Sequence, residues 1–186
     1  MTGKLEARNN IVLIGFMGTG KTTAGRLLAE RTGRAFVDLD EEIERLLGMP
    51  VSTIFTQYGE CFFREQEQQV IKQIICRSNI VFATGGGAVL LEENIRNLQQ
   101  CGLMVTLKCR PEVIIKRIVS DNSVRPLLNC ENRLQVITEL LQERNSRYET
   151  ANFCIDTSML STDEVVKKLE DLITIWKDSM LLAKPI

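Results

Sequence analysis

GFMGTGKT, residues 15–22, is the stretch of sequence that decides the fold. It matches the Walker A pattern G-x-x-x-x-G-K-[ST], and it stands between the apolar run Ile11–Ile14 and a helical pattern over 21–31. This strand–loop–helix context favours a phosphate-binding loop over the alternative, a glycine turn that happens to precede a lysine. In such a loop, backbone N–H groups and the positive end of the following helix surround phosphate oxygens. The sequence therefore predicts a site for nucleotide phosphates.

The same loop indicates which nucleotide chemistry to expect. Lys21 is placed to reach the β- and γ-phosphates, and the Thr22 hydroxyl is placed to bind Mg²⁺. The chain contains no Asn-Lys-x-Asp string, which would recognise guanine, and 186 residues are too few for an ABC-type ATPase. We therefore expect ATP and Mg²⁺ as cofactors and a small-molecule kinase as the class of enzyme.

Composition limits the other possibilities. Of the 186 residues, 44% are hydrophobic and 25% charged, which is typical of one globular domain, and the formal net charge is −1. The near-neutral charge argues against a nucleic-acid partner, and the absence of histidine excludes Ser-His-Asp catalysis. Six cysteines without a CxxC pair indicate reduced thiols. With no signal-peptide pattern, no apolar run that could cross a bilayer and no obvious apolar interface stripe, we expect a cytoplasmic monomer without a membrane partner.

Apolar runs and amphipathic stretches alternate along the chain, as they do in parallel α/β proteins. Strands are predicted at 11–14, 35–37, 80–83, 103–107 and 152–155, and helices at 21–31, 60–76, 92–100, 111–119, 131–150 and 162–177. Two segments depart from the alternation: 41–58 adds helical material, and 120–128 is polar and broken by proline. Departures of this kind often carry substrate binding and lids. We predict a single α/β P-loop domain over residues 1–186, with helices on both faces of the sheet.

Two aspartates stand at the end of the second predicted strand, in the string FVDLD. In extended backbone the side chains of Asp38 and Asp40 would point the same way. One could then hold Mg²⁺ through water while the other accepts the proton of a substrate hydroxyl. The alternative is a solvated turn in which Asp40 caps the helical stretch 41–47. Asp156, at the end of the fifth predicted strand, competes with Asp38 for the metal.

A glycine run and an arginine are further candidates for the site. Gly85, Gly86 and Gly87 follow the third predicted strand, where their backbone N–H groups could approach a ligand at the mouth of the sheet. The alternative is a flexible strand-to-helix turn. Arg64 has Glu67 one helical turn later, a spacing that lets the carboxylate hold the guanidinium. On spacing alone, an ordinary surface pair on the helix is the more common arrangement.

Three more arginines could contact anionic groups. Arg125 stands before a proline in the segment 120–128, where it could reach phosphate as a lid closes. Arg144 and Arg147 lie on the predicted helix 131–150. Neighbouring glutamates could neutralise both of them on a solvated face, which is the alternative to a role in binding.

Taken together and in this order, the motifs resemble those of the shikimate kinase family. The family pattern is GFMGxGK[ST], F-x-D-x-D, G-E-x-x-F-R-x-x-E, GGG, R-P-L-L and E-R-x-x-x-Y. Here these motifs stand at 15–22, 36–40, 59–67, 85–87, 125–128 and 143–148. The resemblance implies a five-stranded parallel sheet of order 2-3-1-4-5, of the nucleoside-monophosphate-kinase type. It also implies a substrate-binding insertion at about 38–67 and a lid at about 116–130.

The resemblance further implies that the 3-hydroxyl of shikimate is phosphorylated by ATP. The nucleotide would be bound by Gly18, Thr19, Gly20, Lys21, Thr22, Thr23 and Arg125, with Mg²⁺ held by Thr22 and, through water, by Asp38. Shikimate would be bound by Asp40, Arg64, Gly85, Gly86, Gly87 and Arg144, the two arginines clamping its carboxylate. The implied catalytic residues are Asp40 as base, with Lys21 and Arg125 stabilising charge on the transferred group. Adenine would lie between Arg117 and the loop after Asp156.

One motif departs from the family, and two rival functions remain to be weighed. The late motif usually reads E-R-x-P-L-Y, whereas here Arg147 replaces an apolar residue beside Arg144. Either arginine could contact the carboxylate, and we predict Arg144. A gluconate kinase of the same architecture lacks the F-x-D-x-D and GGG combination, and its usual histidine motif cannot occur in this chain. A regulatory module without catalysis would be expected to lose Lys21, Asp40 or Arg125, all of which are present.

Overall fold

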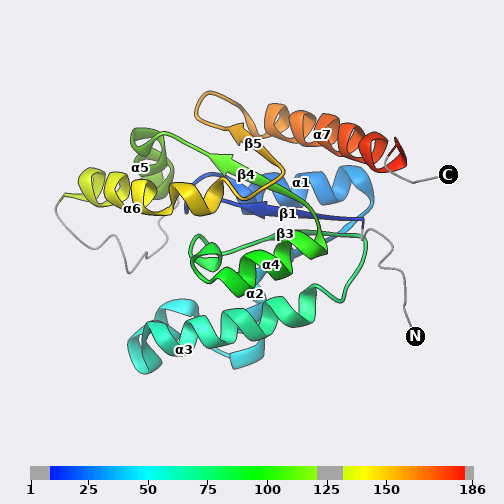
Figure 1. Ribbon diagram of the computed structural model, residues 1–186. Coiled ribbons are helices and arrows are strands. Elements are labelled where there is room, and N and C mark those ends of the chain that lie inside the picture. Colours follow the sequence, from blue (N-terminus) through cyan, green and yellow to red (C-terminus); the bar gives the residue numbers. More distant parts are fainter. Residues whose placement is uncertain (1–8, 121–131, 183–186) are drawn as a thin grey trace.

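A computed structural model describes residues 9–120 and 132–182 (Figure 1). Its elements follow in chain order: β1 (Asn10–Ile14), α1 (Lys21–Thr32), β2 (Ala35–Asp38), α2 (Leu39–Leu47), α3 (Val51–Ile74), β3 (Ile80–Ala83), the 3-10 turn η1 (Ala88–Leu90), α4 (Glu92–Cys101), β4 (Gly102–Lys108), α5 (Pro111–Ser120), α6 (Arg133–Tyr148), β5 (Phe153–Asp156) and α7 (Thr162–Leu182). The five strands lie within one residue of their predicted bounds.

The strands form one parallel sheet in the order β2-β3-β1-β4-β5, which confirms the predicted topology. The central strand β1 pairs with β3 on one side and β4 on the other, so that Ile11 lies opposite Val81 and Leu103. All five residues of β1 are buried. A strand buried on both faces has no polar face, which explains why it reads as a continuous apolar run.

Helices cover both faces of the sheet, giving the three predicted layers (Figure 1). On one face α1 and α7 pack over side chains such as Leu13 and Val105. On the other face α3, α4 and α6 pack over Val12, Phe82 and Met104. Successive residues of a strand point to opposite faces, so β1 contributes alternately to both apolar clusters.

The sheet order brings segments that are far apart in sequence to one edge. Parallel strands all end at the same edge of a sheet, where ligands bind in open α/β folds. β1 ends at the loop 15–20, β2 at Asp38, and β3 just before the glycine turn 84–87. Because β2, β3 and β1 are neighbours, these three loops lie side by side and supply most of the candidate site.

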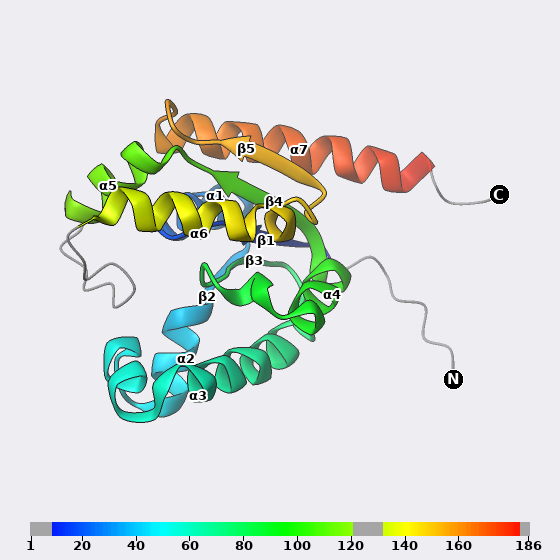
Figure 2. The ribbon, with the colours of Figure 1, turned by 60° about the vertical axis from the view of Figure 1, so that its left-hand side comes forward.

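The α2–α3 unit follows β2 and contains the extra helical material expected over 41–58. α3 is broken at Gly59, whose backbone (φ 80°, ψ 174°) is not helical, so that the predicted helix over 60–76 corresponds to the second half of α3. In Figure 2, α2 and α3 lie at the bottom of the view, and α5 and α6 lie above them toward the left. Both units adjoin the edge of the sheet at which the three loops meet.

The predicted helices over 111–119 and 131–150 are present as α5 and α6. Most of the expected lid between them, including Arg125, lies outside the described residues. Within residues 9–120 and 132–182, no helix is both long and apolar enough to cross a membrane.

Candidate active site

The loop between β1 and α1 has the backbone that a phosphate site requires. Gly20, at the N-cap of α1, has φ 95°, a conformation that residues with a Cβ rarely adopt. The Lys21 side chain is 7% exposed, and its Nζ donates to the carbonyl oxygens of Gly15 (2.8 Å) and Phe16 (2.9 Å). The ammonium group therefore lies within the loop that its charge would serve, next to the N-terminus of α1.

A cavity of about 510 Å³ adjoins this loop. Arg117 of α5 crosses one side of it, with Nη2 donating to the Thr157 carbonyl (2.7 Å) and Nη1 to the Thr157 hydroxyl (3.1 Å). The Thr157 hydroxyl also lies 3.0 Å from the carbonyl oxygen of Thr19. The expected adenine position, between Arg117 and the loop after Asp156, thus coincides with a cavity. Its lining includes four of the predicted nucleotide residues, Gly18, Thr19, Gly20 and Thr23.

Thr22 and Asp38, the two predicted metal ligands, are in direct contact. The Thr22 hydroxyl donates to Oδ2 of Asp38 over 2.8 Å, although the residues lie on different elements. Within the described residues, no group of three or more carboxylate or thiol side chains could hold a metal by itself. This donor set fits Mg²⁺, which keeps several waters and takes much of its coordination from nucleotide phosphates.

The prediction that Asp38 and Asp40 extend from a strand in parallel is wrong. α2 begins at Leu39, directly after β2, and the Asp38 side chain caps that helix by accepting from the Asp40 N–H over 3.0 Å. The helix cap considered from the sequence therefore exists, but Asp38 forms it rather than Asp40. Asp40 lies in the first turn of α2, where it lines two neighbouring cavities.

Asp156, the competing metal carboxylate, turns to its own loop. Its Oδ1 accepts from the backbone N–H of Ser158 (2.8 Å) and from the Ser158 hydroxyl. These hydrogen bonds lower the pKa of Asp156 below its ordinary value. Asp156 ends β5, which is one outer strand of the sheet, whereas Thr22 contacts Asp38 at the end of β2, the outer strand on the opposite side. Asp156 therefore takes no part in the contact between the two predicted metal ligands.

A second, smaller cavity of about 90 Å³ has Asp40 in its lining. Its lining brings together all the predicted substrate residues, from four different elements: Asp40, Arg64, Gly85, Gly86, Gly87 and Arg144. A third cavity, of about 140 Å³, connects the cavity beside Arg117 with this small cavity. Its lining includes Lys21, Thr22, Asp38 and Asp40. Each neighbouring pair of cavities shares lining residues. The site is therefore one track, with the phosphate loop in the middle and two arginines at its far end.

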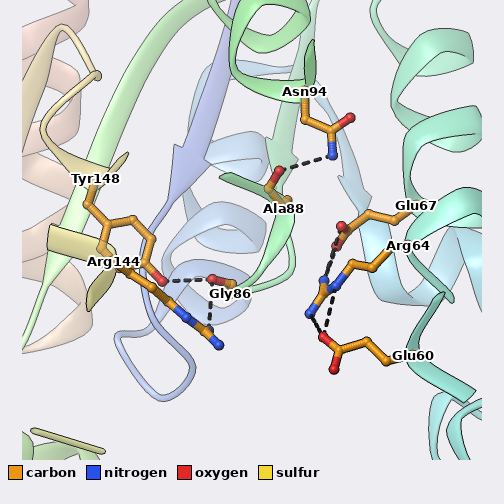
Figure 3. Close-up of polar contacts among 8 residues, drawn as sticks. All are labelled: Glu60, Arg64, Glu67, Gly86, Ala88, Asn94, Arg144 and Tyr148. Atoms are coloured by element: carbon orange, nitrogen blue, oxygen red, sulfur yellow. Dashed lines mark hydrogen bonds and ion pairs between the residues drawn. The ribbon is translucent and has the colours of Figure 1, made fainter. Parts of the chain in front are cut away.

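Arg64 enters that far end from α3 and is held by carboxylates. Its Nη1 donates to both oxygens of Glu67, each at 3.1 Å, and the Glu67 side chain is fully buried (Figure 3). Burial raises the pKa of Glu67 to about 7, although Arg64 partly counteracts it. For Arg64, burial works to lower the pKa, but Glu67 and Glu60 together outweigh it and raise the pKa. The pairing expected from spacing is confirmed, and it lies inside the site rather than on the surface.

Arg144 approaches from α6, on the opposite side of the glycine turn (Figure 3). It is 7% exposed, its Nη1 lies 3.5 Å from the Gly86 carbonyl oxygen, and its guanidinium lies over the Phe16 ring. The Tyr148 hydroxyl donates to the same carbonyl over 2.7 Å. Burial raises the pKa of Tyr148 to about 12, so this hydroxyl stays a hydrogen-bond donor even at alkaline pH.

Arg147, the other arginine of α6, has a different partner from Arg144. It is paired with Glu92 of α4 and is substantially exposed. Arg144 is the arginine that lines the small cavity. This agrees with the choice of Arg144, and it also shows that the solvated-face alternative applies to Arg147 alone.

The glycine turn is packed closely between these groups. A Cβ at Gly87 would stand 2.6 Å from Cζ of Arg64, closer than any side chain permits. A Cβ at Gly85 would stand 2.9 Å from Oδ1 of Asp40. The buried Asn94 of α4 donates to the Ala88 carbonyl over 3.0 Å and so fixes the end of the turn (Figure 3). Glycines here allow side chains of the site to approach, in addition to any backbone contact with a ligand.

Three supporting residues were not predicted from the sequence: Glu60, Asn94 and Tyr148. Tyr148 belongs to the E-R-x-x-x-Y motif and lies four residues after Arg144, so helical periodicity could have placed both on one face. Glu60 lies four residues before Arg64 and could have been found in the same way. No local signal links Asn94 to the glycine turn.

Comparison with known proteins agrees with this arrangement. The shikimate kinase family model matches residues 17–174. A shikimate kinase of Thermodesulfovibrio yellowstonii is 48% identical over 160 residues, covering 86% of this chain and 92% of the relative. One from Moorella thermoacetica is 42% identical over 171 residues, covering 92% and 98%.

The fold is also similar to that of a solved shikimate kinase. The structure of shikimate kinase from Acinetobacter baumannii in complex with shikimate has a TM-score of 0.85 and 40% identity, covering 91% of this chain and 94% of that one. The sheet order and the helices on both faces are those of the nucleoside-monophosphate-kinase type of P-loop fold. From motifs, fold and relatives alike, the chain belongs to the shikimate kinase family.

Proposed function

We propose that this protein is the enzyme that transfers the γ-phosphoryl group of ATP to the 3-hydroxyl of shikimate, giving shikimate 3-phosphate and ADP. This reaction serves the synthesis of chorismate and the aromatic amino acids. The observation that carries the proposal is the continuous track of three cavities. It runs from a nucleoside-sized space, past the phosphate loop, to a small cavity with two arginines suited to a carboxylate.

At the phosphate loop, Lys21 would leave the carbonyls that it contacts and neutralise charge on the β- and γ-phosphates. Thr22 would bind Mg²⁺ directly and Asp38 would hold it through water. Their 2.8 Å contact supports this because it brings the two side-chain oxygens together, as ligation of one ion by both residues would require. An Mg²⁺ ion held by these two residues would offset negative charge on the phosphates.

In the small cavity, Asp40 would act as base toward the 3-hydroxyl. It lines both the phosphate cavity and the acceptor cavity, which is the position an in-line transfer requires. Arg64 and Arg144 would bind the carboxylate from opposite sides of the glycine turn. Gly86 would offer backbone contact, with its carbonyl held by Tyr148.

Residues 38–67 would then form the substrate-binding insertion, and residues 116–130 would form a lid of the single domain. A kinase must exclude water from the γ-phosphate, or ATP is hydrolysed instead. Arg125, in the lid, would stabilise charge on the transferred group. We further propose that the enzyme acts as a cytoplasmic monomer without nucleic-acid or membrane partners. Gel filtration with light scattering tests the oligomeric state.

The test is an assay that couples ADP formation to NADH oxidation, with ATP, Mg²⁺ and shikimate. The wild-type enzyme should turn over shikimate, and gluconate should not replace it. Asp40→Asn keeps the shape of the side chain but removes the base, so kcat should fall about 10²- to 10⁴-fold while ATP binding by calorimetry stays nearly unchanged. If Asp40→Asn keeps the kcat of the wild type, the base is another group.

A further inference from the structure

Both ends of the Arg64 guanidinium are engaged by carboxylates of its own helix. Nη1 donates to both carboxylate oxygens of Glu67. On the other side, Oε1 of Glu60 accepts from Nε (3.2 Å) and from Nη2 (2.9 Å) of Arg64 (Figure 3). The Nε–Nη2 edge is one of the two forks with which arginine binds a carboxylate. Glu60 therefore occupies the fork that Glu67 leaves available.

The two carboxylates differ in how easily they can leave. The Glu67 side chain is fully buried, and separating it from Arg64 would strand a charge in the interior. The Glu60 side chain is 50% exposed, so it can turn into water at little cost. Glu67 is thus a fixed partner of Arg64, whereas Glu60 is an exchangeable one.

Arg144, the second arginine of the small cavity, differs from Arg64 in its contacts. Arg144 contacts the Gly86 carbonyl and the Phe16 ring, and it forms no ion pair with any residue in 9–120 or 132–182. Both arginines line the small cavity, while Glu60 is not among its lining residues. A carboxylate that enters this cavity would meet Arg144 directly, but it would find the remaining fork of Arg64 already in use.

We propose that Glu60 competes with the substrate carboxylate for Arg64 and thereby sets the affinity for the acid. This inference rests on the proposed function, because it concerns the acceptor site of that reaction. The incoming carboxylate replaces Glu60 on the Nε–Nη2 edge, so Arg64 keeps two carboxylate partners throughout. Each binding event must break the Glu60 contact, and affinity is lower than it would be with that edge open.

The local sequence explains how Glu60 reaches this position. The helix is broken at Gly59, and Glu60 is the first residue of its second half, four residues before Arg64. A carboxylate in a first helical turn is also favoured by the helix dipole. Helix stabilisation alone would therefore account for a glutamate here, and the experiment must separate the two roles.

The test compares Glu60→Gln and Glu60→Ala with wild type and with Glu65→Gln. Glu65 is an exposed neighbour on the same helix, so its change removes the same charge without touching the Arg64 contact. Both Glu60 variants should lower the KM for shikimate about twofold to fivefold, the range expected for a half-exposed ion pair. The kcat and the KM for ATP should stay within about twofold, and Glu65→Gln should match wild type.

A second measurement identifies the carboxylate as the group concerned. Benzoate carries a ring carboxylate and benzamide is its neutral counterpart. As inhibitors competing with shikimate, benzoate should gain potency in Glu60→Gln and benzamide should not. A raised KM for shikimate would show that Glu60 positions Arg64, and an unchanged KM would show that it is a bystander. Either result overturns the inference while an active wild-type enzyme keeps the proposed function. An inactive wild type would overturn both.

Discussion

Glu67→Gln offers a stability experiment whose outcome can be worked out from the structure. Glu67 is fully buried against Arg64, and burial raises its pKa from the ordinary 4.5 to about 7, with nearby Asp40 and Glu60 adding to the effect. Between pH 4.5 and about 7, the folded protein therefore holds a proton on this carboxyl that the unfolded chain has already released, whereas above about pH 7 Glu67 is the charged partner of Arg64. Glutamine has nearly the same shape and does not titrate in this range.

The sign follows from the direction of the pKa change. A raised pKa in the folded state contributes stability that is fully present below pH 4.5 and is lost as pH rises through about 7. Across that interval the free energy of unfolding should fall by about 3 kcal/mol in total. The wild-type free energy of unfolding minus that of Glu67→Gln should therefore decrease by about 3 kcal/mol between pH 4 and pH 8.

Urea unfolding followed by circular dichroism, at several pH values, measures this difference. Groups that titrate in both proteins cancel in the subtraction, which isolates Glu67. Glu65→Gln, which removes an exposed carboxylate from the same helix, is the matched control. If the difference between wild type and Glu67→Gln is the same at every pH, Glu67 titrates normally and its burial does not have the consequence argued here.

Two further predictions concern substrate binding. Gly87→Ala is compatible with the local backbone (φ −103°, ψ −2°), but its Cβ would displace the Arg64 guanidinium, so the KM for shikimate should rise at least about tenfold in steady-state kinetics. An unchanged KM would mean that Arg64 does not bind the substrate. Arg144→Ala should raise the same KM about 10- to 100-fold, whereas Arg147→Ala, which breaks only a surface pair with Glu92, should change it less than about twofold. The reverse ranking would assign the carboxylate to Arg147.

Much of this fold could be predicted from sequence because its strongest signals are local. A strand buried on both faces must be apolar throughout, so β1, β3 and β4 stand out as short runs. The phosphate loop requires glycines and a lysine at fixed spacing, which makes it readable without any tertiary information. The sheet order was confirmed, but it came from the resemblance to a family and not from these local patterns.

The errors arose where two elements meet without a loop. Asp38 and Asp40 were treated as strand residues, since nothing between them signals a turn. α2 begins at the residue between them, and the capping preference of aspartate determines the geometry instead. The two carboxylates still reach the site, but by different routes from the one predicted.

Other features depend on contacts that no local pattern encodes. The choice between Arg144 and Arg147 rests on Glu92 and Gly86, which lie more than 50 residues away in the chain. In the same way, Asn94 shows its role only once α4 packs beside the glycine turn. Spacing on a helix predicts which residues share a face, but not which face looks into the site.

The most direct test is to identify the product itself. The enzyme is incubated with ATP, Mg²⁺ and an equimolar mixture of shikimate and gluconate, and the phosphorylated acid is identified by ³¹P–¹H correlation NMR. We predict that phosphate appears on the oxygen of carbon 3 of shikimate and that gluconate remains unchanged. Phosphate on gluconate, on another shikimate hydroxyl, or on neither acid would contradict the proposed function.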